Sequence, residues 1–133
     1  MKISKTFLIP FIVILICSGF ANAQDNVEDS HAKAIRLALE AGGMNTKGHP
    51  LLSKNYGPFL SKLGFSLINP TNYVPKAGDM RAFQPYSGGD PVGHIDVYDG
   101  NQWVSDFKEP NFWPSAKYKK YHPNYQIFRW LRK

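Results

Sequence analysis

The sequence predicts an α+β domain in which helices come first and a meander of antiparallel strands follows. Apolar residues recur at helical spacing in the first half of the chain, up to Gly64. From Phe65 onward the periodicity changes, and short apolar or alternating segments are separated by turn residues. No internal repeat and no low-complexity segment interrupts this order. We therefore expect N-terminal helices packed on an antiparallel sheet.

The first 23 residues have the pattern of a cleavable signal peptide. A basic start precedes an apolar run at residues 7–17, which is too short to span a bilayer about 30 Å thick as a helix. Ala21-Asn22-Ala23 then places small residues at the two positions that a signal peptidase reads. We expect the mature protein to begin at Gln24 and to form one domain over residues 24–133, periplasmic or secreted from a bacterium, with no stable membrane insertion.

Cleavage would change the chemistry available to the protein. It removes Cys17, the single cysteine, so the mature chain would have no thiol nucleophile, disulfide or cysteine metal ligand. It also removes two lysines, which lowers the net charge from +6 to +4. Basic residues crowd the C-terminus, as on a solvated face or on a surface that attracts an anionic polymer. Export and the lack of a nucleic-acid-binding motif argue against nucleic acid as a partner, and we expect no cofactor.

Two helices are expected before the sheet. The first begins at a cap formed by Asp29 or Ser30 and ends at Gly42-Gly43, where glycine permits a left-handed residue. The second covers residues 52–63. Its weak point is Pro58, which either breaks the helix or begins a fresh turn.

Five strands are expected to follow, at residues 65–68, 80–84, 93–98, 102–107 and 125–130. Asp99-Gly100 predicts a tight hairpin between the third and the fourth of these strands. A two-residue turn there places His94 opposite Ser105, whereas a three-residue loop places His94 opposite Asp106. Residues 110–123 are expected to form a loop rich in aromatic residues and lysine.

Several short motifs follow one another along nearly the whole mature chain. They are Ala32 to Gly43, Tyr56-Gly57-Pro58-Phe59-Leu60, Gly64-Phe65, Pro75-Lys76-Ala77-Gly78-Asp79, Gly93-His94-Ile95 and Trp103-Val104-Ser105-Asp106-Phe107-Lys108. In this order and spacing they resemble the papain-like cell-wall amidases, namely CHAP and NlpC-type domains and the amidase effectors of type VI secretion. The resemblance implies a cysteine nucleophile at the start of the first helix, where the helix end and a neighbouring imidazole lower the thiol pKa.

Carried over onto this chain, the resemblance implies that His94 is the base and that Asp106 orients its imidazole. The nucleophile position, however, is occupied by His31. An acyl-imidazole is fragile and the geometry suits a short thiol, so we expect His31 not to be a competent nucleophile. Three further residues are expected to contact substrate: Asp96, Ser105 and Trp113. The alternatives are an exposed strand position for Asp96 and aromatic packing for Trp113.

The resemblance implies an exported homologue of peptidoglycan cysteine amidases that binds cell-wall stem peptides, or a protein partner through the same surface, without cleaving them. Two alternatives stay open. One is an active amidase or endopeptidase that uses His31 or a bound metal, because His31, His94 and Asp106 form a set suited to zinc or iron. The other is an interaction protein, for example an immunity-type decoy that captures an inhibitor of a competent relative.

Overall fold

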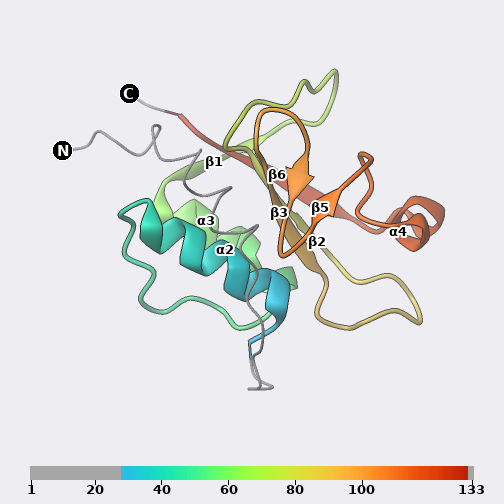
Figure 1. Ribbon diagram of the computed structural model, residues 1–133, viewed down its shortest axis with the longest axis horizontal. Coiled ribbons are helices and arrows are strands. Elements are labelled where there is room, and N and C mark those ends of the chain that lie inside the picture. Colours follow the sequence, from blue (N-terminus) through green and yellow to red (C-terminus); the bar gives the residue numbers. More distant parts are fainter. Residues whose placement is uncertain (1–27, 132–133) are drawn as a thin grey trace.

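The computed structural model describes residues 28–131, which fold into an α+β domain built on a six-stranded antiparallel sheet (Figure 1). The strands follow the order β1-β6-β2-β3-β4-β5. Their bounds are β1 Phe65–Ile68, β2 Met80–Phe83, β3 His94–Tyr98, β4 Trp103–Val104, β5 Lys108–Glu109 and β6 Tyr125–Trp130. Helices α2 and α3 lie against one side of the sheet, and the short α4 lies on the other side (Figure 1). The predicted α+β class and antiparallel sheet are confirmed.

The predicted signal peptide at residues 1–23, with its cleavage site after Ala23, lies outside the described residues. Cys17 belongs to that segment, so the described part of the chain carries no thiol. Between residues 28 and 131, no helix is long and apolar enough to cross a bilayer.

The helix α2 (Ser30–Ala41) is capped by Asp29. The Oδ1 atom of Asp29 accepts a hydrogen bond at 2.8 Å from the backbone N–H three residues along the chain. The same carboxylate also accepts bonds from the backbone N–H of Ser53 at 2.6 Å and from the Ser53 hydroxyl at 2.8 Å. Asp29 thus fixes the first turn of α2 and joins it to the 3₁₀ turn η2 (Ser53–Asn55).

The predicted second helix is divided into η2 and the helix α3 (Tyr56–Leu63). Pro58 lies in the first turn of α3, where a backbone N–H has no partner within the helix, so its missing donor costs no helical hydrogen bond. The helix ends at Gly64, whose φ of +116° is a left-handed value that glycine adopts without strain. The helix therefore restarts at Tyr56, two residues before the fresh turn predicted at Pro58, and the continuous helix from residue 52 is wrong.

The loop between β3 and β4 differs from both predicted registers. It contains four residues, 99–102, and the register pairs Tyr98 with Trp103. The Asp99 carboxylate accepts hydrogen bonds at 2.7 Å from two backbone N–H groups of the loop, which stabilises the longer connection. Neither predicted register is present, because the N–H of Asp99 donates to the carbonyl oxygen of Gln102 at 3.0 Å and the chain reverses at residues 100–101 instead of at Asp99-Gly100.

The chain after β4 also departs from the prediction. β4 ends at Val104 instead of continuing to residue 107, and a turn at residues 105–107 leads into β5, which pairs back with β4. Residues 110–123 contain the helix α4 (Ala116–Tyr121) in place of a continuous loop. The Ser115 hydroxyl caps α4 by accepting a hydrogen bond at 3.3 Å from the N–H of Tyr118.

The two faces of the sheet differ in character. Side chains facing α2 and α3 form an apolar core that includes Ile35, Leu60, Met80, Ile95 and Phe128. The opposite face of β2 and β3 carries two buried cross-strand pairs, Arg81 with Asp96 and Phe83 with His94. Aromatic side chains from the α4 region cover this face, and the rings of Phe83 and Tyr118 lie 5.4 Å apart. Polar chemistry is thus held on the side of the sheet away from the helical core.

We expect Asp29→Ala to destabilise the protein by about 2–3 kcal/mol, because it removes a helix cap and leaves the N–H of Ser53 without its acceptor. Urea denaturation followed by circular dichroism measures this loss as a lower transition midpoint with an unchanged slope.

The matched control is Asp90→Ala. Asp90 is exposed and accepts a single bond of 3.2 Å from the N–H of Val92, so the expected loss is below about 1 kcal/mol. Equal losses for the two variants would contradict the role given to Asp29.

Candidate functional site

The first turn of α2 meets the start of β3, and each contributes a histidine. His31 lies at the second residue of α2, and His94 is the first residue of β3. Their ring centroids are 4.5 Å apart, with an edge-to-face angle of 64°. The ring of Phe107, in the β4–β5 turn, lies 6.0 Å from His31 and 6.3 Å from His94. The His31 side chain is 24% exposed and the His94 side chain is 3% exposed, so solvent reaches the pair from the His31 side.

Gly93 sets the position of His94. Its φ is +77°, and a Cβ there would lie 2.5 Å from the carbonyl oxygen of Phe83 and 2.8 Å from the Cβ of Lys54. Any other residue would strain the backbone and push the start of β3 away from β2. The pair Gly93-His94 is therefore required by packing as well as by any chemistry at the ring.

His31 is held by Asp106 in the turn at residues 105–107. Its Nδ1 lies 2.6 Å from Oδ1 of Asp106, and the Ser105 hydroxyl donates to the same oxygen at 3.1 Å. Burial raises the pKa of the Asp106 carboxyl, but the hydrogen bond and charge of His31 outweigh burial and hold that pKa well below its usual value. An ionised carboxylate only accepts hydrogen bonds, so Nδ1 of His31 carries the proton in this contact.

His94 is bound by a different carboxylate. Its Nε2 lies 2.8 Å from Oε2 of Glu109 and 3.3 Å from Oδ2 of Asp96. Burial lowers the pKa of His94, but the hydrogen bonds and charges of these two carboxylates outweigh burial and raise the pKa to about 9. Burial, reinforced by the charge of Asp96, also raises the pKa of Glu109. His94 and Glu109 therefore hold a proton between them to a higher pH than either group would alone.

Arg81 lies behind this pair and is fully buried. Its guanidinium donates from Nε and Nη2 to the two oxygens of Asp96, at 3.0 and 2.8 Å. Nη1 donates to the carbonyl oxygen of Phe112 at 2.7 Å, and the guanidinium carbon lies 3.7 Å from the centroid of the Trp103 ring. Burial raises the pKa of Asp96, but Arg81 and His94 outweigh it and keep that pKa low. Asp96 is thus ionised beneath His94.

The structure corrects the predicted orienting carboxylate. The sequence places Asp106 beside His94, but Asp106 bonds to His31 and Glu109 bonds to His94. The four-residue loop and the turn at 105–107 direct Asp106 toward α2, whereas pairing of Glu109 with Trp103 brings Glu109 under β3. The sequence does not predict the contact of Glu109 with His94, because Glu109 lies in a two-residue strand that has no recognisable sequence pattern.

The three residues predicted to contact substrate differ in burial and in their contacts. Asp96 and Ser105 are both fully buried, the first bonded to Arg81 and the second to Asp106, so the exposed alternative for Asp96 is wrong. Trp113 is half-buried and stacks on the ring of His122 at 4.6 Å, within the aromatic cluster near α4. The packing alternative for Trp113 therefore describes its surroundings.

One cluster behind the histidine pair has the residue types of a metal site. Ligand atoms of His94, Asp96 and Glu109 all lie within 4.8 Å of one another. Arg81, however, bonds to both oxygens of Asp96 and lies 3.6 Å from Oε1 of Glu109, so its positive charge takes the place that a cation would occupy. The predicted set containing Asp106 has no common centre, because Asp106 bonds directly to one of the two imidazoles.

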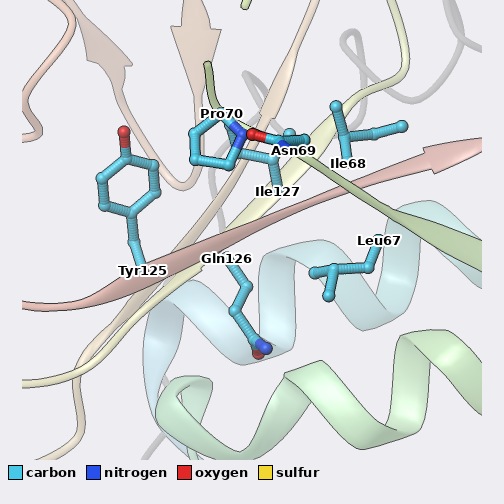
Figure 2. Close-up of a pocket in the computed structure, with 7 residues that line it drawn as sticks. All are labelled: Leu67, Ile68, Asn69, Pro70, Tyr125, Gln126 and Ile127. Atoms are coloured by element: carbon cyan, nitrogen blue, oxygen red, sulfur yellow. The ribbon is translucent and has the colours of Figure 1, made fainter.

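An open pocket of about 460 Å³ lies elsewhere, between β1, the loop that follows it and β6 (Figure 2). It is lined by Leu67, Ile68, Asn69, Pro70, Tyr125, Gln126 and Ile127. In Figure 2, Tyr125 and Pro70 lie on the face of the sheet away from the helices, whereas the side chain of Gln126 points toward the helices. No residue of the histidine pair or of its carboxylates lines this pocket, so it is separate from the candidate site.

Comparison with known proteins gives one consistent match. No protein-family model matches the chain, and no curated protein matches it significantly. Among solved structures, a chain of the native type VI effector–immunity complex Tae3–Tai3 from Ralstonia pickettii is 31% identical, with a TM-score of 0.71 over 90% of this chain and 96% of that chain. A chain of the selenomethionine form of the complex is also 31% identical, with a TM-score of 0.69 over 87% of this chain and 96% of that chain.

We expect the protein to lose stability on the order of 2 kcal/mol as pH rises from about 6.5 to about 9, because the pKa of His94 is raised from 6.5 to about 9 on folding. A group whose pKa is raised in the folded state contributes its full stabilisation below the unfolded pKa and loses it as pH passes the folded pKa. Guanidinium denaturation at several pH values measures the slope, and NMR titration of the imidazoles assigns it.

The variant Glu109→Gln should lower the pKa of His94 and flatten this pH dependence. His122→Gln, which alters a ring stacked on Trp113, is the control and should leave the slope unchanged. A wild-type unfolding free energy that is constant between pH 6.5 and 9 would show that His94 is not held charged.

Proposed function

This chain belongs to the family of the matched subunit of the type VI effector–immunity complex Tae3–Tai3, and on that basis we propose that it is an exported, catalytically impaired relative of peptidoglycan amidases. In this proposal the domain has the papain-like scaffold of the CHAP and NlpC-type enzymes. It binds the stem peptides of the cell wall and does not cleave them. The export pattern at residues 1–23 supports a location in the periplasm or outside the cell.

The observation that carries the proposal is the position of His31. It lies in the first turn of α2 with its ring 4.5 Å from that of His94, which is where a cysteine amidase needs its thiolate beside the base. A thiolate at that point gains from the positive end of the helix and from the imidazolium. An imidazole held at 2.6 Å by Asp106 supplies neither the charge nor the reactivity of that sulfur.

The rest of the arrangement supports retention of the family's base. His94 and Glu109, joined at 2.8 Å, form the base and the carboxylate that orients it, with Asp96 and Arg81 behind them. In a competent enzyme this base would protonate the leaving amine after attack on the amide carbonyl. In this proposal only the nucleophile is defective, and the acid–base residues His94 and Glu109 are retained.

A second candidate is supported by the setting of the matched structures, which are effector–immunity complexes. The chain would then act as an interaction protein that binds a protein partner through the face around His31 and Phe107. Phe107 is 45% exposed, which suits a contact residue. Co-sedimentation with insoluble peptidoglycan separates the two candidates, because a cell-wall ligand predicts retention by sacculi without any added protein.

We expect the wild-type protein to release no peptide from purified peptidoglycan, and His31→Cys to release peptide at a measurable rate. The reason is that the variant restores a thiol between the helix end and His94. Chromatography of the soluble muropeptides measures the products, with chelator present throughout. Adding His94→Ala to the cysteine variant should lower its rate by about 10²-fold or more, the contribution of general acid–base catalysis.

His49→Cys provides the matched control, because it introduces a thiol in a loop outside the histidine pair. It should release nothing. Peptide release by the wild-type protein that is lost in His94→Ala would overturn the assignment as an impaired enzyme, and a folded but inactive His31→Cys would show that the defect extends beyond the nucleophile.

A further inference from the structure

Both histidines of the pair have a carboxylate at one ring nitrogen. Asp106 lies 2.6 Å from Nδ1 of His31, and Glu109 lies 2.8 Å from Nε2 of His94. Histidines that bind metals almost always donate their other ring N–H to such an acceptor, which fixes the tautomer and makes the ligating nitrogen more basic. A cysteine–histidine pair needs one carboxylate to orient its single imidazole. The second carboxylate–imidazole contact, at His31, therefore has no counterpart in cysteine–histidine chemistry.

The hydrogen bonds leave one nitrogen of each ring available. Nε2 of His31 and Nδ1 of His94 have no hydrogen-bond partner among residues 28–131. Because the carboxylates bind the opposite nitrogens, a neutral ring carries its lone pair on the available atom, and this is the form that binds transition metals.

The charges around the pair favour a cation. The ionisable groups that face the two rings are Asp106, Asp96, Glu109 and Arg81. Three carboxylates and one guanidinium therefore surround the two rings, an excess of acidic over basic side chains. The positive end of α2 opposes a cation by about 1 kcal/mol at most, and the Asp29 cap offsets part of that. A divalent ion that displaces a proton from the pair would be attracted by this excess.

The rings are closer together than a shared ion requires. A zinc ion about 2.1 Å from one nitrogen of each ring, at a tetrahedral angle, places the two ring centroids about 5.3 Å apart. The observed separation is 4.5 Å. Reaching the liganded geometry requires the rings to separate by about 0.8 Å, which the partly exposed His31 side chain can provide by rotation.

We propose that His31 and His94 form a binding site for a divalent transition-metal ion, through Nε2 of His31 and Nδ1 of His94. Asp106 and Glu109 act as positioning residues that hold the two rings. Zinc, nickel and copper are the class of ion that imidazole ligands favour. The remaining coordination positions are open to water or to a carboxylate or amide oxygen of a bound molecule. This site is distinct from the buried cluster of His94, Asp96 and Glu109, where Arg81 already supplies the cation.

The test is titration of the protein, produced without an affinity tag and freed of metal by a chelator, with Zn²⁺ at pH 7.5. Isothermal titration calorimetry should show one saturable site, with protons released on binding. Co²⁺ should give visible absorption bands of a nitrogen-coordinated ion. His31→Gln should weaken Zn²⁺ binding at least 10-fold, and Asp106→Asn, at a partly exposed position, should weaken it about 10- to 100-fold. His49→Gln is the control and should bind as tightly as the wild type.

The variant His31→Cys distinguishes failure of the metal site from failure of the proposed function. His31→Cys should bind Zn²⁺ at least as tightly as the wild type, because thiolate is also a zinc ligand. Retention on peptidoglycan in the presence of chelator should be unaffected by any loss of metal binding. The absence of a saturable site, or equal affinity in the wild type, His31→Gln and Asp106→Asn, would overturn the metal site while leaving cell-wall binding untouched.

Discussion

The buried guanidinium of Arg81 is the constraint around which the polar half of the molecule is arranged. A fully buried positive charge is tolerated only where hydrogen bonds and opposite charge surround it, and removal of one partner from such a pair costs about 3–5 kcal/mol. Asp96 lies directly opposite Arg81 in the β2–β3 register and binds it through both oxygens. Trp103 and the carbonyl of Phe112 complete the enclosure. Four consecutive strands of the sheet order, β2 to β5, are thereby tied to one charge.

This constraint positions His94 independently of residue 31. Asp96 and Glu109 both reach Nε2 of His94, and Arg81 fixes Asp96, so the orientation of the imidazole is determined from beneath the sheet. His31 approaches from the other side, on α2, and makes its hydrogen bond to the turn at residues 105–107. The support of His94 is therefore independent of whether residue 31 carries a thiol or an imidazole. This independence is what the proposed function requires of a site whose nucleophile has been replaced.

How much the sequence could predict depends on whether a feature is local. The helix after Asp29 and the strands at 65–68, 80–83 and 94–98 follow from apolar spacing and from glycine positions, and the structure has them within one or two residues. The pairing of Glu109 with His94 depends on a four-residue loop and a two-residue strand, whose geometry is set by side-chain hydrogen bonds and tertiary packing. A signal did exist for Arg81, because an arginine in the short apolar run Met80–Phe83 calls for a buried acid on a neighbouring strand.

In the proposed function, the presence of a histidine at residue 31 also accounts for the position of Asp106. A cysteine amidase, as the family resemblance implies, places a negative thiolate next to its imidazolium. Histidine brings no negative charge to that position, and an isolated imidazole beside the raised-pKa ring of His94 would suffer repulsion whenever both were protonated. Asp106, ionised and 2.6 Å from His31, places one negative charge beside the pair. In the proposed function the imidazole of His31, held by this carboxylate, stands where a thiol would act, and such an arrangement is suited to holding a ligand rather than to breaking a bond.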